Sequence, residues 1–92
     1  MTAATRQRLA IVNIKGLHAR ASARFVETVE GFDATADVFK DGLSAAGDSI
    51  MGLLMLAASV GTTIEVATSG PEATALAEAL AALVADKFGE GM

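Results

Sequence analysis

The chain changes from an extended to a helical pattern within residues 16–26, GLHARASARFV. Residues 9–14, just before this stretch, are apolar and β-branched with a period of two, which predicts a strand. The spacing i, i+3, i+4, i+7 of a buried helix face is met by Ser22, Phe25, Val26 and Val29. His18, the single histidine, therefore lies at the predicted start of a helix.

The start of a helix gives His18 a specific chemical environment. The first turn leaves backbone N–H groups without intrahelical partners and carries the positive end of the helix dipole, which stabilises an anion and favours a neutral imidazole. Arg20 adds a guanidinium suited to phosphate or carboxylate oxygens. These features predict a histidine that attacks a phosphoryl donor and then holds the group against free amides. The alternative is a solvated helix end with no chemical role.

Two segments resemble the HPr family, the histidine phosphocarriers of the phosphoenolpyruvate-dependent phosphotransferase system. Residues 16–20, GLHAR, followed by small residues and Phe25-Val26, resemble the active-site segment of that family. Residues 48–56, DSIMGLLML, resemble its regulatory serine and the short helix after it. Both segments occur in the order and at about the separation of the family, and the resemblance extends from about residue 8 to residue 88.

The resemblance implies roles for particular residues. His18 would accept a phosphoryl group on Nδ1 from enzyme I, itself charged from phosphoenolpyruvate, and pass it to a IIA-type domain. Arg20 would balance the phosphate charge, with the backbone amides of Ala19 and Arg20 as further donors. Ser49 would be phosphorylated by an HPr kinase/phosphorylase, and that phosphate would oppose docking of partners. The chain would be a carrier without a cofactor that turns over only with partner enzymes, and not an enzyme itself.

A partner surface is expected near these residues. The segment after Ser49 is apolar nearly all round, so some of its side chains are expected to face solvent, unless neighbouring elements cover them. Methionine suits a surface that accepts several partners, and the resemblance favours Ile50 and Met51, with Leu54, as partner-facing. Basic residues crowd into the first quarter of the chain and include Arg24, which adds a positive patch near His18.

One position departs from the family pattern. The family usually has proline directly after the arginine, whereas this chain has Ala21. Position 21 lies in the first helical turn, where proline is tolerated because its missing N–H has no intrahelical partner. Alanine restores that N–H and gives up the fixed φ, so altered transfer rates with phosphorylation retained are expected.

Composition limits the other classes of function. A length of 92 residues predicts one domain, and the resemblance implies that this is an HPr-like domain spanning 1–92. No cysteine and one histidine exclude a disulfide and a histidine- or cysteine-rich metal site, and a net charge of −4 without a basic block argues against nucleic-acid binding. The most apolar window, residues 50–60, is too short to insert across a membrane, and a polar N-terminus indicates no secretory signal. A cytoplasmic monomer is expected.

The remaining pattern predicts the order of elements. The expected elements are a frayed tail at 1–5, a strand at 7–14, a helix from His18 to Glu30-Gly31, a strand at 33–39, an Asp-Gly turn at 40–43, a strand at 43–45, a helix at 50–56 capped by Ser49, a strand at 62–68 and a last helix. The last helix begins either with Gly70 as N-cap and Pro71 next, or with a capping box of Ser69 and Glu72. Its apolar stripe runs from Ala73 to Phe88.

This order, βαββαβα, predicts an α+β open-faced sandwich. A four-stranded antiparallel sheet would have three helices on one face, which is also the HPr-like fold. Two other functions stay open at this point. Asp48-Ser49 also resembles the phosphopantetheine site of acyl carrier proteins, which are all-helical. A regulatory HPr-like protein that binds partners without carrying a phosphoryl group is the other alternative.

Overall fold

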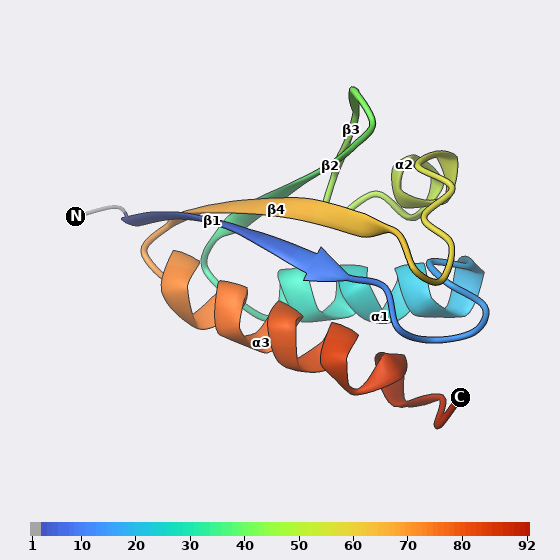
Figure 1. The fold of residues 1–92 in the computed structure, drawn as a ribbon. Helices are drawn as coiled ribbons and strands as arrows, with labels where there is room; N and C mark the ends of the chain where they lie inside the picture. The colour runs from blue at the N-terminus through green and yellow to red at the C-terminus, as the bar shows by residue number, and fades with distance from the viewer. Residues whose placement is uncertain (1–2) are drawn as a thin grey trace.

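The structure, a computed structural model, describes residues 3–92, so the first two residues of the predicted tail lie outside the described residues. Figure 1 shows the order of elements along the chain. They are β1 (Ala3–Ala10), α1 (Ala19–Glu30), β2 (Thr35–Lys40), β3 (Leu43–Ala46), α2 (Ile50–Met55), β4 (Thr63–Gly70), α3 (Ala73–Ala85) and the short 3-10 helix η1 (Lys87–Gly89).

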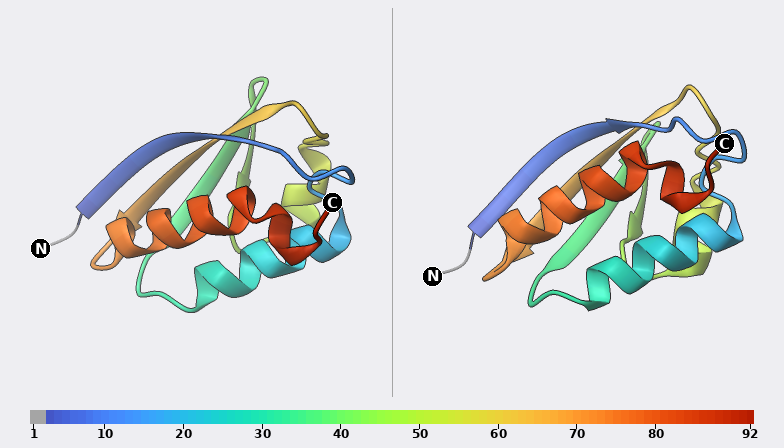
Figure 2. Two further views of the ribbon diagram at one scale, coloured as in Figure 1. Left: turned by 60° about the horizontal axis from the view of Figure 1, so that its bottom comes forward. Right: turned by 90° about the horizontal axis from the view of Figure 1, so that it is seen from below.

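The four strands form one antiparallel sheet in the order β1-β4-β2-β3. Helices α1 and α3 lie side by side on one face of this sheet, as both views in Figure 2 show. Helix α2 packs against α1 and β3 at one end. Within residues 3–92 no helix covers the other face, where Arg6 pairs with Glu65 and lies over the ring of Phe39. The predicted open-faced sandwich is confirmed.

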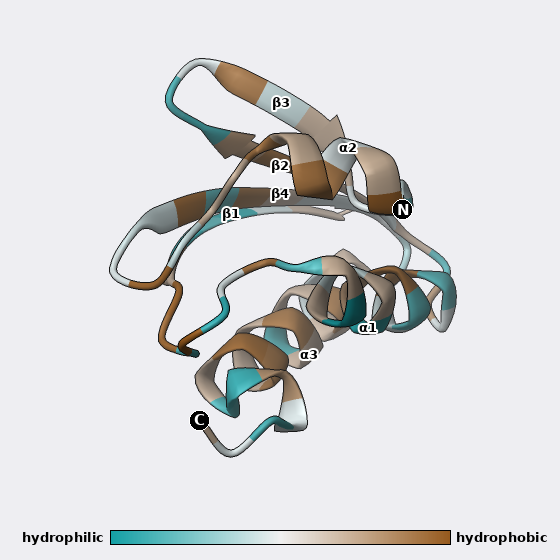
Figure 3. Cartoon of the chain, turned by 90° about the vertical axis from the view of Figure 1, so that its right-hand side faces the viewer, coloured by the Kyte–Doolittle hydropathy of each residue, from teal (hydrophilic) through white to brown (hydrophobic). Residues whose placement is uncertain are grey.

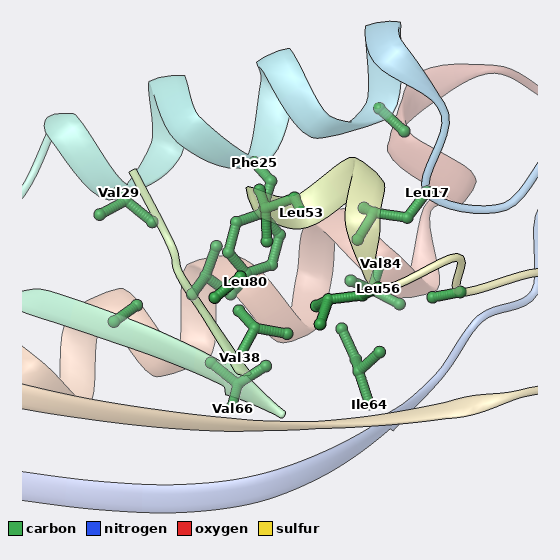
Figure 4. Close-up of a cluster of buried hydrophobic side chains, with 14 of the residues drawn as sticks. Leu17, Phe25, Val29, Val38, Leu53, Leu56, Ile64, Val66, Leu80 and Val84 are labelled. Carbon is green, nitrogen blue, oxygen red and sulfur yellow. The ribbon is translucent and has the colours of Figure 1, made fainter. Parts of the chain in front are cut away.

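The core lies between the sheet and the two long helices. Figure 4 shows the inward side chains of β2 and β4 meeting those of α1, α2 and α3. Leu53 and Leu56 close the end of this core from the α2 segment and are 0% and 2% exposed. Buried side chains at this centre include Phe25, Val38, Leu53, Leu56, Ile64, Val66, Leu80 and Val84. The buried positions alternate along both strands, with Ala36 and Val38 in β2 and Ile64, Val66 and Thr68 in β4.

The hairpin between β2 and β3 forms where the Asp-Gly pair predicts it. Asp41 and Gly42 have φ values of 50° and 81°. Two consecutive positive φ values are characteristic of a type I′ turn, whose twist matches that of antiparallel strands. The register then places Lys40 opposite Leu43.

The first strand lies four residues earlier than the sequence predicts at each end. It runs Ala3–Ala10 and not 7–14, and Ala3, Ala4 and Thr5 are strand residues and not a frayed tail. The reason is pairing, because β1 faces β4 over its whole length, from Ala3 opposite Gly70 to Ala10 opposite Thr63. Residues 11–14 are apolar but leave the sheet to form the loop that leads to His18.

The last helix begins later than either predicted cap. Gly70 belongs to β4, with φ at 117°, and Glu72 is the N-cap of α3 without a side-chain capping bond. The carboxylate of Glu72 accepts the N–H of Asp33 at 2.7 Å, so a tertiary contact takes the group that a capping box would use. Phe88 is fully buried, but it lies in η1, beyond the end of α3.

Candidate functional site

His18 is the N-cap of α1, as the sequence predicts. Its backbone is extended, with φ at −76° and ψ at −176°, and its carbonyl oxygen accepts the N–H of Ser22 at 2.8 Å. The ring atom Nδ1 accepts the backbone N–H of Arg20 at 3.3 Å. Nδ1 therefore faces the first helical turn, where amides lack intrahelical carbonyls and the helix dipole is positive.

The other ring nitrogen of His18 meets a carboxylate from near the end of the chain. Its Nε2 is in hydrogen-bond contact with Oε2 of Glu90. The two side chains are 26% and 12% exposed, so water has limited access to this contact. Glu90 follows η1 directly, and this turn brings its carboxylate to the start of α1.

Asn13 connects Glu90 to the loop that precedes His18. Its Nδ2 donates to Oε1 of Glu90 at 2.9 Å and to the carbonyl oxygen of Gly16 at 2.8 Å. Asn13 is fully buried, so these bonds form away from bulk water and fix the position of the carboxylate. The side-chain amide of Asn13 thus connects the carboxylate of Glu90 to the backbone of Gly16, two residues before His18.

Asn13 and Glu90 are site residues that were not predicted from the sequence. Asn13 interrupts the apolar run of residues 9–14, and a polar side chain within such a run indicates that it has hydrogen-bond partners in the folded protein. Glu90 is 72 residues away from His18, and no local pattern connects the two.

Glu90 is held in its charged form. Burial alone would raise the pKa of its carboxyl, but hydrogen bonds from Asn13 and His18, with the charges of protonated His18 and of Lys15, outweigh burial. The net effect holds this pKa below the ordinary value of 4.5. Near neutral pH, Glu90 is therefore a carboxylate that accepts a hydrogen bond on each oxygen.

The two contacts of the His18 ring define one tautomer. Because Nδ1 accepts the N–H of Arg20, it carries a lone pair and no proton. A neutral imidazole then has its proton on Nε2, from which it donates to the carboxylate of Glu90. In this tautomer Nδ1 is the unprotonated and therefore nucleophilic ring atom, and it lies next to the helix start.

The predicted cations gather beside this pair. A pocket of about 210 Å³ is lined by Lys15, Arg20 and Arg24 together with Glu90. His18 does not line that pocket. It lines a neighbouring one of about 300 Å³ with Lys15 and with Leu54 of α2. The structure thus brings Arg20 and Arg24 together, and it places His18 between their basic pocket and the apolar side of α2.

Helix α2 carries the predicted apolar surface. Ile50 and Met51 are 40% and 70% exposed, and Leu54 is half-buried. Figure 3 colours most of α2 as hydrophobic and shows this helix beside the strands β2 and β3. Met55, which the sequence analysis did not assign to the partner surface, is also exposed, at 75%. An exposed apolar group of this kind is typical of a binding surface.

Ser49 is the N-cap of α2, as predicted. Its Oγ accepts the N–H of Gly52 at 3.0 Å, and its own N–H donates to the carbonyl of Ala46. The hydroxyl side chain is partly exposed at the edge of the apolar surface. Strands β3 and β4 precede and follow this segment and belong to one four-stranded sheet. This contradicts the acyl carrier interpretation of Asp48-Ser49, because acyl carrier proteins are all-helical.

Other classes of site leave no trace in the part of the chain that the structure describes. Among residues 3–92, no three His, Cys, Asp or Glu side chains come together as metal ligands would. No helix between residues 3 and 92 combines the length and apolar character needed to span a bilayer.

Comparisons with known proteins identify the family of this chain. Residues 5–86 match the family description "PTS HPr component phosphorylation site". A phosphocarrier protein HPr of Cupriavidus necator is 42% identical over 88% of this chain and 91% of its own length. A phosphocarrier protein NPr of Shewanella violacea is 39% identical over 98% of each chain.

The fold agrees with the sequence matches. The crystal structure of an HPr from Thermoanaerobacter tengcongensis superposes with a TM-score of 0.90 at 34% identity, over 96% of this chain and 99% of that one. The strand order and the helix positions described above are thus shared with a solved HPr. The chain belongs to the HPr family of phosphocarrier proteins of the phosphotransferase system.

Proposed function

We propose that this protein carries a phosphoryl group on Nδ1 of His18, received from enzyme I and delivered to a IIA-type domain. The observation that carries the proposal is the orientation of the imidazole. Glu90 takes the Nε2 side of the ring, while Nδ1 faces the amides of the first turn of α1. Those amides and the helix dipole are suited to an anionic phosphoryl group.

The chemistry requires little from the protein besides position. The lone pair of Nδ1 forms a bond to phosphorus as the bond from phosphorus to the donor breaks. In delivery, a nucleophile of the acceptor domain bonds to phosphorus as the bond from Nδ1 breaks, which regenerates the free ring. The amides of Ala19 and Arg20 and the guanidinium of Arg20 balance the added charge. Ala21, third in the helix and fully buried, leaves its N–H near the same end. The proposal therefore includes phosphoryl transfer through His18 with Ala21 in place of the usual proline.

The partners are proposed to dock on the surface around His18. Arg24 supplies a second cation beside Arg20, and Ile50, Met51 and Leu54 supply the apolar part. A partner with an apolar centre and acidic groups at its rim fits this combination. The proposal includes a cytoplasmic monomer, and it leaves open whether the pathway serves sugar uptake or nitrogen-linked regulation.

The intact mass of the protein tests this function. After incubation with enzyme I, magnesium and phosphoenolpyruvate, we expect one phosphate-sized gain that is lost in acid, as for a phosphohistidine. A competent enzyme I that produces no gain would overturn carriage. In that case the exposed surface of α2 would support the second candidate, a regulatory binding protein of the same fold.

Ser49 is proposed as a site of regulation by an HPr kinase/phosphorylase. We expect Ser49→Asp to weaken docking to enzyme I about tenfold, because it places a negative charge at the edge of the apolar and basic surface. The matched control is Ser49→Asn, which has the same size without the charge. Both residues are good N-caps, so the stability of α2 should change little. Titration of enzyme I with each variant measures the effect, and equal affinities would contradict regulation through charge.

A further inference from the structure

We propose that Glu90 is a positioning residue that holds the proton of His18 on Nε2 while the phosphoryl group arrives at and leaves Nδ1. The inference deepens the proposed function and rests on it for its consequence, but the tautomer itself is a property of the free protein. The contact between Nε2 of His18 and Oε2 of Glu90 carries the proposal.

Glu90 is held in place independently of His18. Oε1 of Glu90 accepts a hydrogen bond from Nδ2 of the buried Asn13 at 2.9 Å, so a second contact holds the carboxylate. Within residues 3–92, Oδ1 of Asn13 is buried without a hydrogen-bond partner. The side-chain amide of Asn13 thus donates two hydrogen bonds through Nδ2, to Gly16 and to Glu90, and accepts none through Oδ1. This orientation makes Asn13 a donor to the carboxylate of Glu90.

The backbone that carries Glu90 is also anchored. Phe88 is fully buried in the core, and the N–H of Glu90 donates to the carbonyl of Lys87 at 3.0 Å. On the far side, the N–H of Ile14 donates to the backbone oxygen of Met92 at 3.2 Å. Residues 88–92 are thus tied to the core and to the loop before His18, which keeps the carboxylate beside the ring.

The charge on the His18 ring changes during transfer. A neutral ring with its proton on Nε2 that attacks through Nδ1 becomes a phosphoimidazolium, and the carboxylate of Glu90 stabilises that positive charge. When the phosphoryl group leaves, the bond between Nδ1 and phosphorus breaks and its electrons return to Nδ1. The ring that keeps Nε2–H departs as neutral imidazole and not as an imidazolate, which is a far poorer leaving group. Glu90 therefore assists transfer in both directions without touching phosphorus.

The imidazole spectrum tests the positioning directly. Because His18 is the sole histidine, a nitrogen-15 spectrum of the ring contains one imidazole. Well above neutral pH we expect Nε2–H in the wild type to be protected from exchange with water, and Nδ1 to be unprotonated. Glu90→Ala should lose this protected resonance. Glu78→Ala, which removes an exposed carboxylate from α3, should keep it. Protection that persists in Glu90→Ala would overturn the proposal.

The rate of transfer tests the consequence. Glu90→Gln keeps the shape and an oxygen acceptor but removes the charge, and we expect it to lower the maximal rate of phosphoryl transfer about tenfold. The concentration of this protein that half-saturates enzyme I should change less than about twofold, because partner contacts are retained. An unchanged maximal rate would overturn the role of the charge. A wild type that accepts no phosphate would instead overturn the proposed function, and the imidazole spectrum would still decide whether Glu90 holds the proton.

Discussion

Replacing His18 by alanine is expected to abolish acid-labile phosphorylation by enzyme I. The substitution removes Nδ1, the proposed phosphoryl acceptor, which lies beside the amides of α1 while Nε2 contacts Glu90. Rescue by a neighbouring nucleophile is not expected, because the other side chains that line the two pockets are mainly cationic or aliphatic. The mass gain seen for the wild type should therefore fall below detection.

A matched variant separates chemistry from folding in this experiment. His18→Ala also removes a cap, which costs about 1 kcal/mol in the free energy of unfolding. His18→Asn restores a good N-cap and still has no imidazole, so it should fold more stably than His18→Ala and remain unphosphorylated. If either variant gained an acid-labile phosphate, His18 would not be the carrier. An acid-stable gain would indicate a serine such as Ser49.

Local signals predicted much of this site. The start of α1 at His18, the cap at Ser49 and the turn at Asp41-Gly42 each depend on a few adjacent residues, and all three are confirmed. The buried positions of β4 follow the period of two that is expected of a strand with one buried side. Within a short window, residue type and spacing were sufficient.

Tertiary contacts decided the rest. Ala3, Ala4 and Thr5 belong to a strand because β4 pairs with them, although their own sequence has little strand character. Glu72 does not form a capping box because its carboxylate bonds the N–H of Asp33. The pairing of Glu90 with His18 joins residues 72 positions apart. Contacts of this kind depend on the whole fold, and no spacing rule in one chain identifies them.

Replacing Gly16 by alanine is expected to be among the most destabilising single changes in the loop before His18. Gly16 has φ at 63°, and a Cβ there would lie 2.4 Å from the carbonyl oxygen of Ala58 and 2.9 Å from Cα of Ser59. Both neighbours are backbone atoms, so relief requires the loop to move. The same oxygen of Ala58 accepts the N–H of Leu17 at 2.9 Å, and that bond would be disturbed as well. We expect a loss of about 3 kcal/mol in the free energy of unfolding.

Gly42→Ala is the control that isolates the steric part of this loss. Gly42 also has a positive φ, 81°, but nothing lies within 4 Å of a Cβ built there. Its substitution should therefore cost only the left-handed backbone penalty of about 1 kcal/mol. Denaturation of both variants measures the difference. Equal losses of stability in the two variants would contradict a clash at Gly16. A larger loss for Gly16→Ala, together with an altered His18 imidazole spectrum, would show that the position of His18 depends on the close packing of this turn against Ala58.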